Sequence, residues 1–111
     1  MPKLKNVLKN GRISLDVEDC QAFVGRRRVN LTSTECNLLA VFLKNQGKTV
    51  SRDDLLSSVW GDTYQGTSRT VDTHIQRLRS KLGTVGRLIR TVRTVGYRLD
   101  RELLQERHHS L

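Results

Sequence analysis

The chain has 111 residues, 36% of them hydrophobic and 28% charged, and its 20 lysines and arginines outnumber its 11 acidic residues to give a net charge of +9. No apolar run approaches the ~18 residues of a membrane-spanning helix, and the first residues lack the apolar stretch of a signal peptide. Two cysteines make no disulfide framework, so we expect Cys20 and Cys36 to be small apolar side chains in a reduced, cytoplasmic protein. A basic single domain is expected to bind a polyanion, nucleic acid before an anionic membrane surface.

The positive charge is concentrated in the C-terminal third. Residues 67–99 contain eight lysines and arginines but one acid, Asp72, whereas the remaining 78 residues have 12 basic and 10 acidic side chains. A surface that is merely solvated usually mixes both signs. The segment 67–99 is therefore the predicted polyanion site.

The N-terminal third is predicted to form a small antiparallel sheet. Apolar and polar residues alternate over 12–18, and short strand-like runs follow at 20–24 and 29–31. Residues 25–28, Gly-Arg-Arg-Arg, are typical of a turn between the last two strands. Because a turn at the tip of a sheet is commonly solvated, we expect its three arginines to lie away from any bound DNA.

Two helices are predicted next. Thr32 and Glu35 have the spacing of a capping box, so a helix begins there, and Gly47 is placed to end it. Ser51 is typical of the start of a second helix, which Gly61 ends. The apolar residues expected to face the core are Leu38, Leu39, Phe42 and Leu43 in the first helix and Leu55, Leu56, Val59 and Trp60 in the second.

A third helix is predicted from Ser68 to Gly83, with a single narrow apolar stripe. The stripe consists of Val71, Ile75, Leu78 and Leu82. The rest of the cylinder carries basic and small polar residues, namely Arg69, Thr70, Thr73, His74, Gln76, Arg77 and Lys81. Such a helix fits the major groove, where Arg and Gln can bond base edges. The alternative is an ordinary amphipathic surface helix.

A basic hairpin follows, with strands at 88–92 and 96–99 joined near residues 93–95. An arginine at its tip would suit an adjacent minor groove. The expected fold is α+β, a winged helix-turn-helix with an N-terminal antiparallel sheet, a three-helix core and a C-terminal hairpin as the wing. We assign residues 1–11 to a linker remnant, 12–100 to the winged-helix DNA-binding domain and 101–111 to a C-terminal tail.

Four runs in this order resemble the C-terminal DNA-binding effector domain of OmpR/PhoB-type response regulators. They are LTSTE at 31–35 with Leu38 and Leu39, VSR at 50–52 with the apolar residues through Gly61, RTVDTHIQRLRSKL at 69–82 and IRTVRTVGYRL at 89–99. The resemblance covers about residues 12–100. It implies a sequence-specific, double-stranded DNA-binding transcription regulator of bacterial two-component systems.

The resemblance also implies roles for individual residues. The base contacts would be Thr73, Gln76 and Arg77. The backbone contacts would be Trp60, Arg69, Thr70, His74, Arg79, Lys81, Thr91, Thr94 and Tyr97, and Arg93 would enter the minor groove. The loop residues Asp62, Thr63, Tyr64 and Gln65 would touch RNA polymerase.

Family members bind direct repeats as head-to-tail dimers, and their receiver domain and sensor kinase would lie outside this chain. Thr94 stands where the family usually has glycine, which is expected to change the turn of the wing. We expect the chain to be either a fragment of a longer regulator or a receiver-less regulator. No cofactor or metal is expected.

Some side chains keep two interpretations. His74 would contact a phosphate or be bonded to its own helix backbone, Trp60 would lie in the core or at the DNA, and Tyr97 would pack in the hairpin or reach a phosphate. Asp72 is expected to orient Arg79 or Arg69 because phosphates repel a carboxylate.

Two other functions remain open, a module whose basic face binds an acidic protein and a non-specific architectural binder. An enzyme is not expected, because the sequence has no nucleophile elbow, no phosphate-binding loop and no paired carboxylates in an apolar setting.

Overall fold

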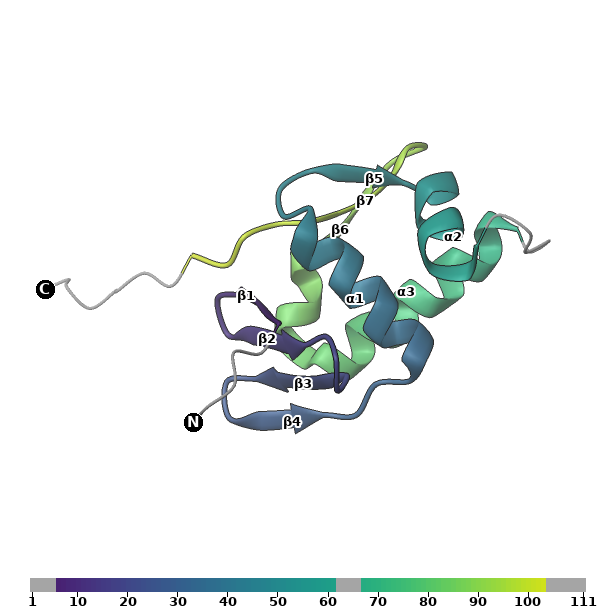
Figure 1. Cartoon of the computed structure of the whole chain (residues 1–111). Coiled ribbons are helices and arrows are strands. Elements are labelled where there is room, and N and C mark those ends of the chain that lie inside the picture. Colours follow the sequence, from purple (N-terminus) through teal and green to yellow (C-terminus); the bar gives the residue numbers. More distant parts are fainter. Residues whose placement is uncertain (1–5, 62–66, 104–111) are drawn as a thin grey trace, which may run out of the picture.

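The computed structural model describes residues 6–61 and 67–103, in which an N-terminal sheet, three α-helices and a C-terminal sheet follow one another along the chain (Figure 1). Helix α1 (Ser33–Lys44) lies in the middle. It contacts the N-terminal strands as well as the other two helices. The architecture is the predicted winged helix-turn-helix.

Four short antiparallel strands form the N-terminal sheet in the order β1-β2-β3-β4. Their bounds are β1 (Val7–Asn10), β2 (Ile13–Asp16), β3 (Gln21–Val24) and β4 (Arg27–Val29). We expected residues 7–10 to belong to a linker, but Leu8 pairs with Leu15 and packs against the core. The second difference is the turn after β3, which is shorter than predicted because Arg27 and Arg28 belong to β4.

The N-terminal strands are joined to the end of the chain by a seam of hydrogen bonds, which we call the terminal seam. Asn10, 4% exposed, donates from Nδ2 to the Asp100 carbonyl oxygen and accepts the Glu102 N–H at its Oδ1, both at 2.9 Å. Glu102 in turn accepts the Arg12 N–H at 2.8 Å and pairs with the Arg12 guanidinium. Glu102 is thus held on the domain, although we placed it in a tail.

The predicted starts of the first two helices are confirmed. Thr32 Oγ1 accepts the Glu35 N–H at 3.2 Å while Glu35 Oε1 accepts the Thr32 N–H at 2.9 Å, which is the capping box of α1. Helix α2 (Arg52–Trp60) begins where Ser51 Oγ accepts the Asp54 N–H at 3.0 Å. Leu55 is the member of its predicted apolar face that is fully buried. The others are half-buried at the edge of the core.

Helix α3 (Ser68–Leu82) is packed by the predicted stripe alone. Val71, Ile75, Leu78 and Leu82 are at most 1% exposed, and they are the buried residues of this helix. Its first residue follows Thr67, which takes the N-cap position instead of Ser68 and makes no side-chain capping bond. Gly83 ends the helix at a φ of +72°, a conformation that glycine adopts without strain. A 3₁₀ helix, η1 (Gly83–Leu88), leads to the C-terminal sheet.

The C-terminal sheet has three strands in the order β5-β7-β6. They are β5 (Thr49–Ser51), β6 (Ile89–Val92) and β7 (Gly96–Leu99), and the β6–β7 hairpin is called the wing below. Strand β5 was not predicted. Its carbonyl at Val50 lies 2.1 Å from where a Cβ on Gly96 would stand, so only glycine allows β7 to pair this closely. Within the described residues, no helix is long and apolar enough to cross a membrane.

Candidate nucleic-acid interface

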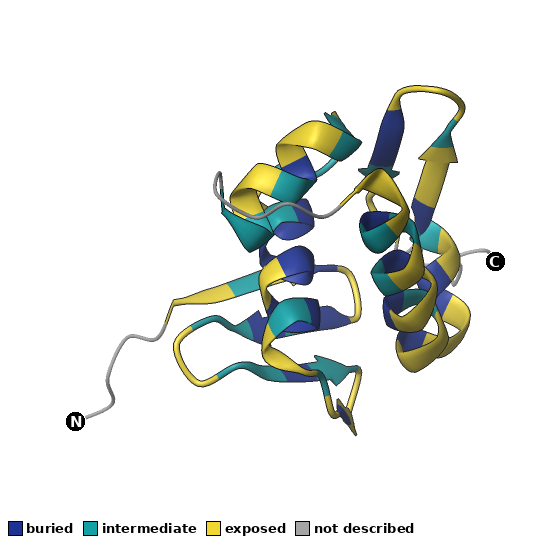
Figure 2. Cartoon of the chain, turned by 90° about the vertical axis from the view of Figure 1, so that its right-hand side faces the viewer, coloured by how far each residue is buried: buried dark blue, intermediate teal, exposed yellow. Residues whose placement is uncertain are grey.

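The face of α3 opposite its apolar stripe is open to solvent (Figure 2). Arg69, Thr73, Gln76 and Arg77 are exposed along it. The side chains of Gln76 and Arg77 have no hydrogen bond or ion pair to another residue in the described part of the chain. Thr73 Oγ1 donates to the Arg69 carbonyl at 3.1 Å. The predicted base-contacting side chains therefore share one exposed surface, which we call the α3 face.

His74 is half-buried at the edge of the α3 face and is bonded to its own helix backbone, as one of its two interpretations predicted. Its Nδ1 lies 2.9 Å from the Thr70 carbonyl oxygen, and its ring meets the Trp60 ring edge-on with centroids 5.1 Å apart. Because a carbonyl only accepts, Nδ1 carries a proton. Nε2 is the remaining ring nitrogen, and it would donate to a phosphate only when it is protonated as well. Trp60 is half-buried against the core and orients the imidazole ring.

Arg79 and Lys81 have partners inside the protein. Arg79 donates to the Ile89 carbonyl at 2.9 and 2.7 Å and to Thr91 Oγ1 at 2.9 Å, so it fixes α3 to strand β6. Lys81 Nζ lies 2.6 Å from Glu35 Oε1, which joins the last turn of α3 to the first turn of α1. Both residues were expected to bind phosphates. Their geometry assigns them first to holding the helix in place.

The expectation for Asp72 is wrong. Its Oδ1 accepts the Tyr97 hydroxyl at 2.5 Å and the Arg52 Nε–H at 2.9 Å, and no hydrogen bond to Arg79 or Arg69 is present. Burial raises the pKa of Asp72, but the hydrogen bonds from Tyr97 and Arg52 outweigh it and hold that pKa below its ordinary value. Asp72 is an ionised acceptor.

Tyr97 belongs to the packing of the wing. It is 4% exposed, and the guanidinium groups of Arg52 and Arg79 lie 5.2 and 5.5 Å from its ring centroid. Burial, followed by its hydrogen bond to Asp72, raises the pKa of the Tyr97 hydroxyl. The hydroxyl is therefore committed to Asp72, which favours hairpin packing over the phosphate contact expected for this residue.

Arg93, Thr94 and Val95 are exposed at the tip of the wing. Thr94 adopts a φ of +62°, so the turn keeps the left-handed conformation that glycine favours, with a β-branched residue in it. The turn closes with a bond from the Val95 N–H to the Val92 carbonyl at 3.0 Å. The Arg93 carbonyl accepts the Thr94 hydroxyl at 2.6 Å, but the Arg93 guanidinium bonds none of the described residues, so its charge is available at the tip.

A hollow of about 320 Å³ separates the wing tip from the starts of α2 and α3. It is lined by Ser51, Arg52, Asp53, Ser68, Thr94 and Val95. Helix N-termini carry a partial positive charge and attract phosphates. Ser51 and Arg52 were not among the residues expected at the interface. Their place in the family-like run at 50–52 is the feature of the sequence that could have indicated them.

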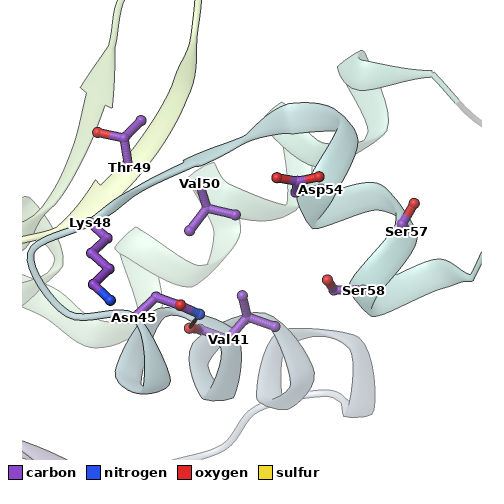
Figure 3. Close-up of a pocket in the computed structure, with 8 residues that line it drawn as sticks. All are labelled: Val41, Asn45, Lys48, Thr49, Val50, Asp54, Ser57 and Ser58. Carbon is purple, nitrogen blue, oxygen red and sulfur yellow. Dashed lines mark hydrogen bonds between the residues drawn. The ribbon is translucent and has the colours of Figure 1, made fainter.

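A second hollow, of about 330 Å³, lies between α1, β5 and α2 (Figure 3). Its lining combines one cation, Lys48, with one carboxylate, Asp54, and Asn45 Nδ2 donates to the Val41 carbonyl at 2.7 Å within it. This balanced lining differs from the cationic α3 face. The expected polymerase-contact residues Asp62, Thr63, Tyr64 and Gln65 lie outside the described residues.

Comparison with known proteins places the chain among transcription regulators. The family model "Transcriptional regulatory protein, C terminal" matches residues 25–99. The heme response regulator HssR of Staphylococcus epidermidis is 37% identical over 100 residues, which cover 88% of this chain and 45% of that protein. The chain therefore spans less than half the length of this relative.

Two solved structures have the same fold. The DNA-binding domain of RstA from Klebsiella pneumoniae, in complex with the RstA box, is 32% identical with a TM-score of 0.75 and covers 86% of this chain and 97% of that one. DrrB of Thermotoga maritima, described as an OmpR/PhoB homologue, is 30% identical with a TM-score of 0.74 and covers 85% of this chain and 44% of that one.

Proposed function

Because the chain belongs to the OmpR/PhoB-type family of transcriptional regulatory protein C-terminal domains, the DNA-binding effector domains of two-component response regulators, we propose that it recognises a specific operator with α3 in the major groove and the wing in the adjacent minor groove. The observation that carries the proposal is the α3 face. One stripe packs the helix on the core, and the opposite side presents Arg77, Gln76 and Thr73 to solvent.

The contacts divide by chemistry. Arg77 and Gln76 have the donors for base edges, and Thr73 has a methyl group for thymine. Arg69, Arg52 and a His74 that carries a proton on Nε2 are suited to phosphates, while Thr70 and Trp60 support the His74 ring. Arg93 would enter the minor groove, with Thr94 beside it at the backbone. Arg79, Lys81, Thr91 and Tyr97 act mainly by holding α3 and the wing.

Other partners follow from family membership and are part of the proposal. A second copy of the chain would bind the next direct repeat head-to-tail, and loop residues 62–65 would contact RNA polymerase. A receiver domain, controlled by a sensor kinase, would belong to the remainder of a longer regulator, as the 45% coverage of HssR suggests.

The test is selection of duplexes from a random-sequence pool at ~150 mM salt, followed by binding titrations. We expect an enriched direct repeat with an A/T-rich flank, and an affinity that falls with salt by ~0.9 logarithmic units per phosphate contact. Binding that shows this salt dependence but equal affinity for all sequences would refute operator recognition and identify a non-specific binder. Failure of duplex DNA to compete with an acidic protein partner would favour a protein-interaction module.

A further inference from the structure

Helix α3 and the wing are joined by two sets of side-chain hydrogen bonds, which we call clamps, at two positions along α3. Near its C-terminus, Arg79 holds strand β6 through the Ile89 carbonyl and Thr91. Seven residues earlier, Asp72 holds strand β7 through the Tyr97 hydroxyl. Seven residues are two turns, so the clamps lie on one side of the helix, ~10 Å apart along its axis. The pairing of β7 with β5 holds the wing to the start of α2, and within the described residues these two clamps are the side-chain hydrogen bonds that hold it to α3 itself.

The covalent connection between α3 and the wing cannot fix the angle between them alone. It runs through η1 at the C-terminal end of α3, beside the Arg79 clamp. The wing tip lies at the other end, facing the start of the helix across the hollow that Ser68 and Thr94 line. Asp72 is the attachment nearer to this tip. It also binds Arg52, so the same carboxylate connects α3, β7 and the first residue of α2.

A carboxylate in this place works against the attraction of DNA. Asp72 is the one acid in residues 67–99, and its lowered pKa keeps it ionised. Replacing it with a neutral residue removes one negative charge, and on electrostatic grounds alone every duplex would then bind more tightly. A geometric role predicts the opposite direction, so the two effects can be separated.

We propose that Asp72 is a positioning residue, which sets the angle between α3 and the wing so that both engage the same duplex. The proposal rests on the proposed function. It assigns no direct DNA contact to Asp72. Without the Asp72–Tyr97 bond, α3 still enters the major groove. The wing keeps the Arg79 clamp and the pairing of β7 with β5, but it is no longer fixed to the N-terminal half of α3 and shifts over the flanking minor groove.

The experiment compares operators whose flank under the wing is A/T-rich or G/C-rich. Asp72→Asn and Tyr97→Phe are each expected to reduce the preference for the A/T flank by about tenfold, the effect of losing a hydrogen bond to a charged group. Binding to the G/C-flanked operator should change by less than about twofold. Asp54→Asn is the matched control because it removes the same charge from an exposed side chain of α2, and it should retain the full preference.

Melting temperatures identify variants that fail to fold. If Asp72→Asn is unstable, Tyr97→Phe still tests the proposal, because it changes no charge and keeps the aromatic ring. Equal flank preference in the wild-type protein and both variants would overturn the role of Asp72 and leave the proposed function intact. The same conclusion would follow if Asp72→Asn, like the Asp54→Asn control, only tightened binding to every duplex through its lost negative charge. A wild-type protein without any operator preference would overturn both.

Discussion

The ion pair between Lys81 and Glu35 gives the sharpest test of how α3 is held. Glu35 is 2% exposed and takes one hydrogen bond from Lys81 in addition to the Thr32 N–H, whereas the Lys81 side chain is 38% exposed. The change Lys81→Met keeps the aliphatic stem but leaves a buried carboxylate with one bond fewer. An unsatisfied buried group costs about 1–3 kcal/mol. Because solvent screens Lys81, we expect the free energy of unfolding to fall by about 1–2 kcal/mol.

The pH dependence of this loss has a defined sign. Burial raises the pKa of Glu35, but the bonds from Lys81 and Thr32 prevail and hold it below the ordinary value of 4.5. The pairing therefore stabilises the folded protein at neutral pH, and its contribution disappears as the pH falls below 4.5 and through the lowered pKa of the folded state. The difference between the wild-type protein and Lys81→Met should shrink over the same interval.

Thermal unfolding at pH 7 and at stepwise lower pH measures both effects. A loss of ~1–2 kcal/mol corresponds to a melting temperature lower by roughly 5–15 °C for a domain of this size. Lys44→Met, on the exposed last turn of α1, is the control and should change stability by less than about 0.5 kcal/mol. Unchanged stability of Lys81→Met with weaker binding to all duplexes would show that Lys81 is a phosphate contact, as first expected.

Four further substitutions separate recognition, packing and backbone strain. Arg77→Ala should weaken operator binding by about 1–3 kcal/mol and relax the preference at one base pair. Arg69→Ala should weaken binding to all duplexes alike and lower the salt slope by about one. If the two variants lost affinity equally for every sequence, the division into base and phosphate contacts would be wrong. Ile75→Ala should reduce the free energy of unfolding by ~2–4 kcal/mol, and a stability within 1 kcal/mol of wild type would mean that the stripe is not the packing surface. Thr94→Gly should stabilise the wing by about 1 kcal/mol in chemical denaturation, because it relieves the positive φ, and a loss of stability would exclude strain there.

Local sequence signals were sufficient for the helices. The capping box at Thr32 and the apolar stripe of α3 depend on residues three to seven positions apart, and both appear in the structure as predicted. Strand β5 was missed because it gains its order from a distant partner, β7. Nothing in the sequence around Val50 indicates that pairing. Strand β1 pairs with the adjacent β2, but its four residues, VLKN, lack the alternation of apolar and polar side chains that marks a strand in a sequence.

The α3 face was predictable for the same reason as its stripe, since helical periodicity fixes both sides of a cylinder at once. The partners of its charged residues were not. Asp72 binds Arg52, which lies 20 residues away on another helix, and Lys81 binds Glu35 at a separation of 46. Sequence reasoning assigns a basic side chain in a basic segment to DNA, because the acid that binds it in the fold comes from a distant part of the chain.

The terminal seam has a mechanical consequence. Asp100 directly follows β7, its N–H donates to the Leu88 carbonyl at 2.8 Å, and its carbonyl accepts the side chain of Asn10. A pull applied to the polypeptide upstream of Asn6 is therefore passed by Asn10 to the stem of the wing, as well as to α1, which β1 also contacts. A module tethered there would be mechanically coupled to the wing, the half of the interface that we propose enters the minor groove.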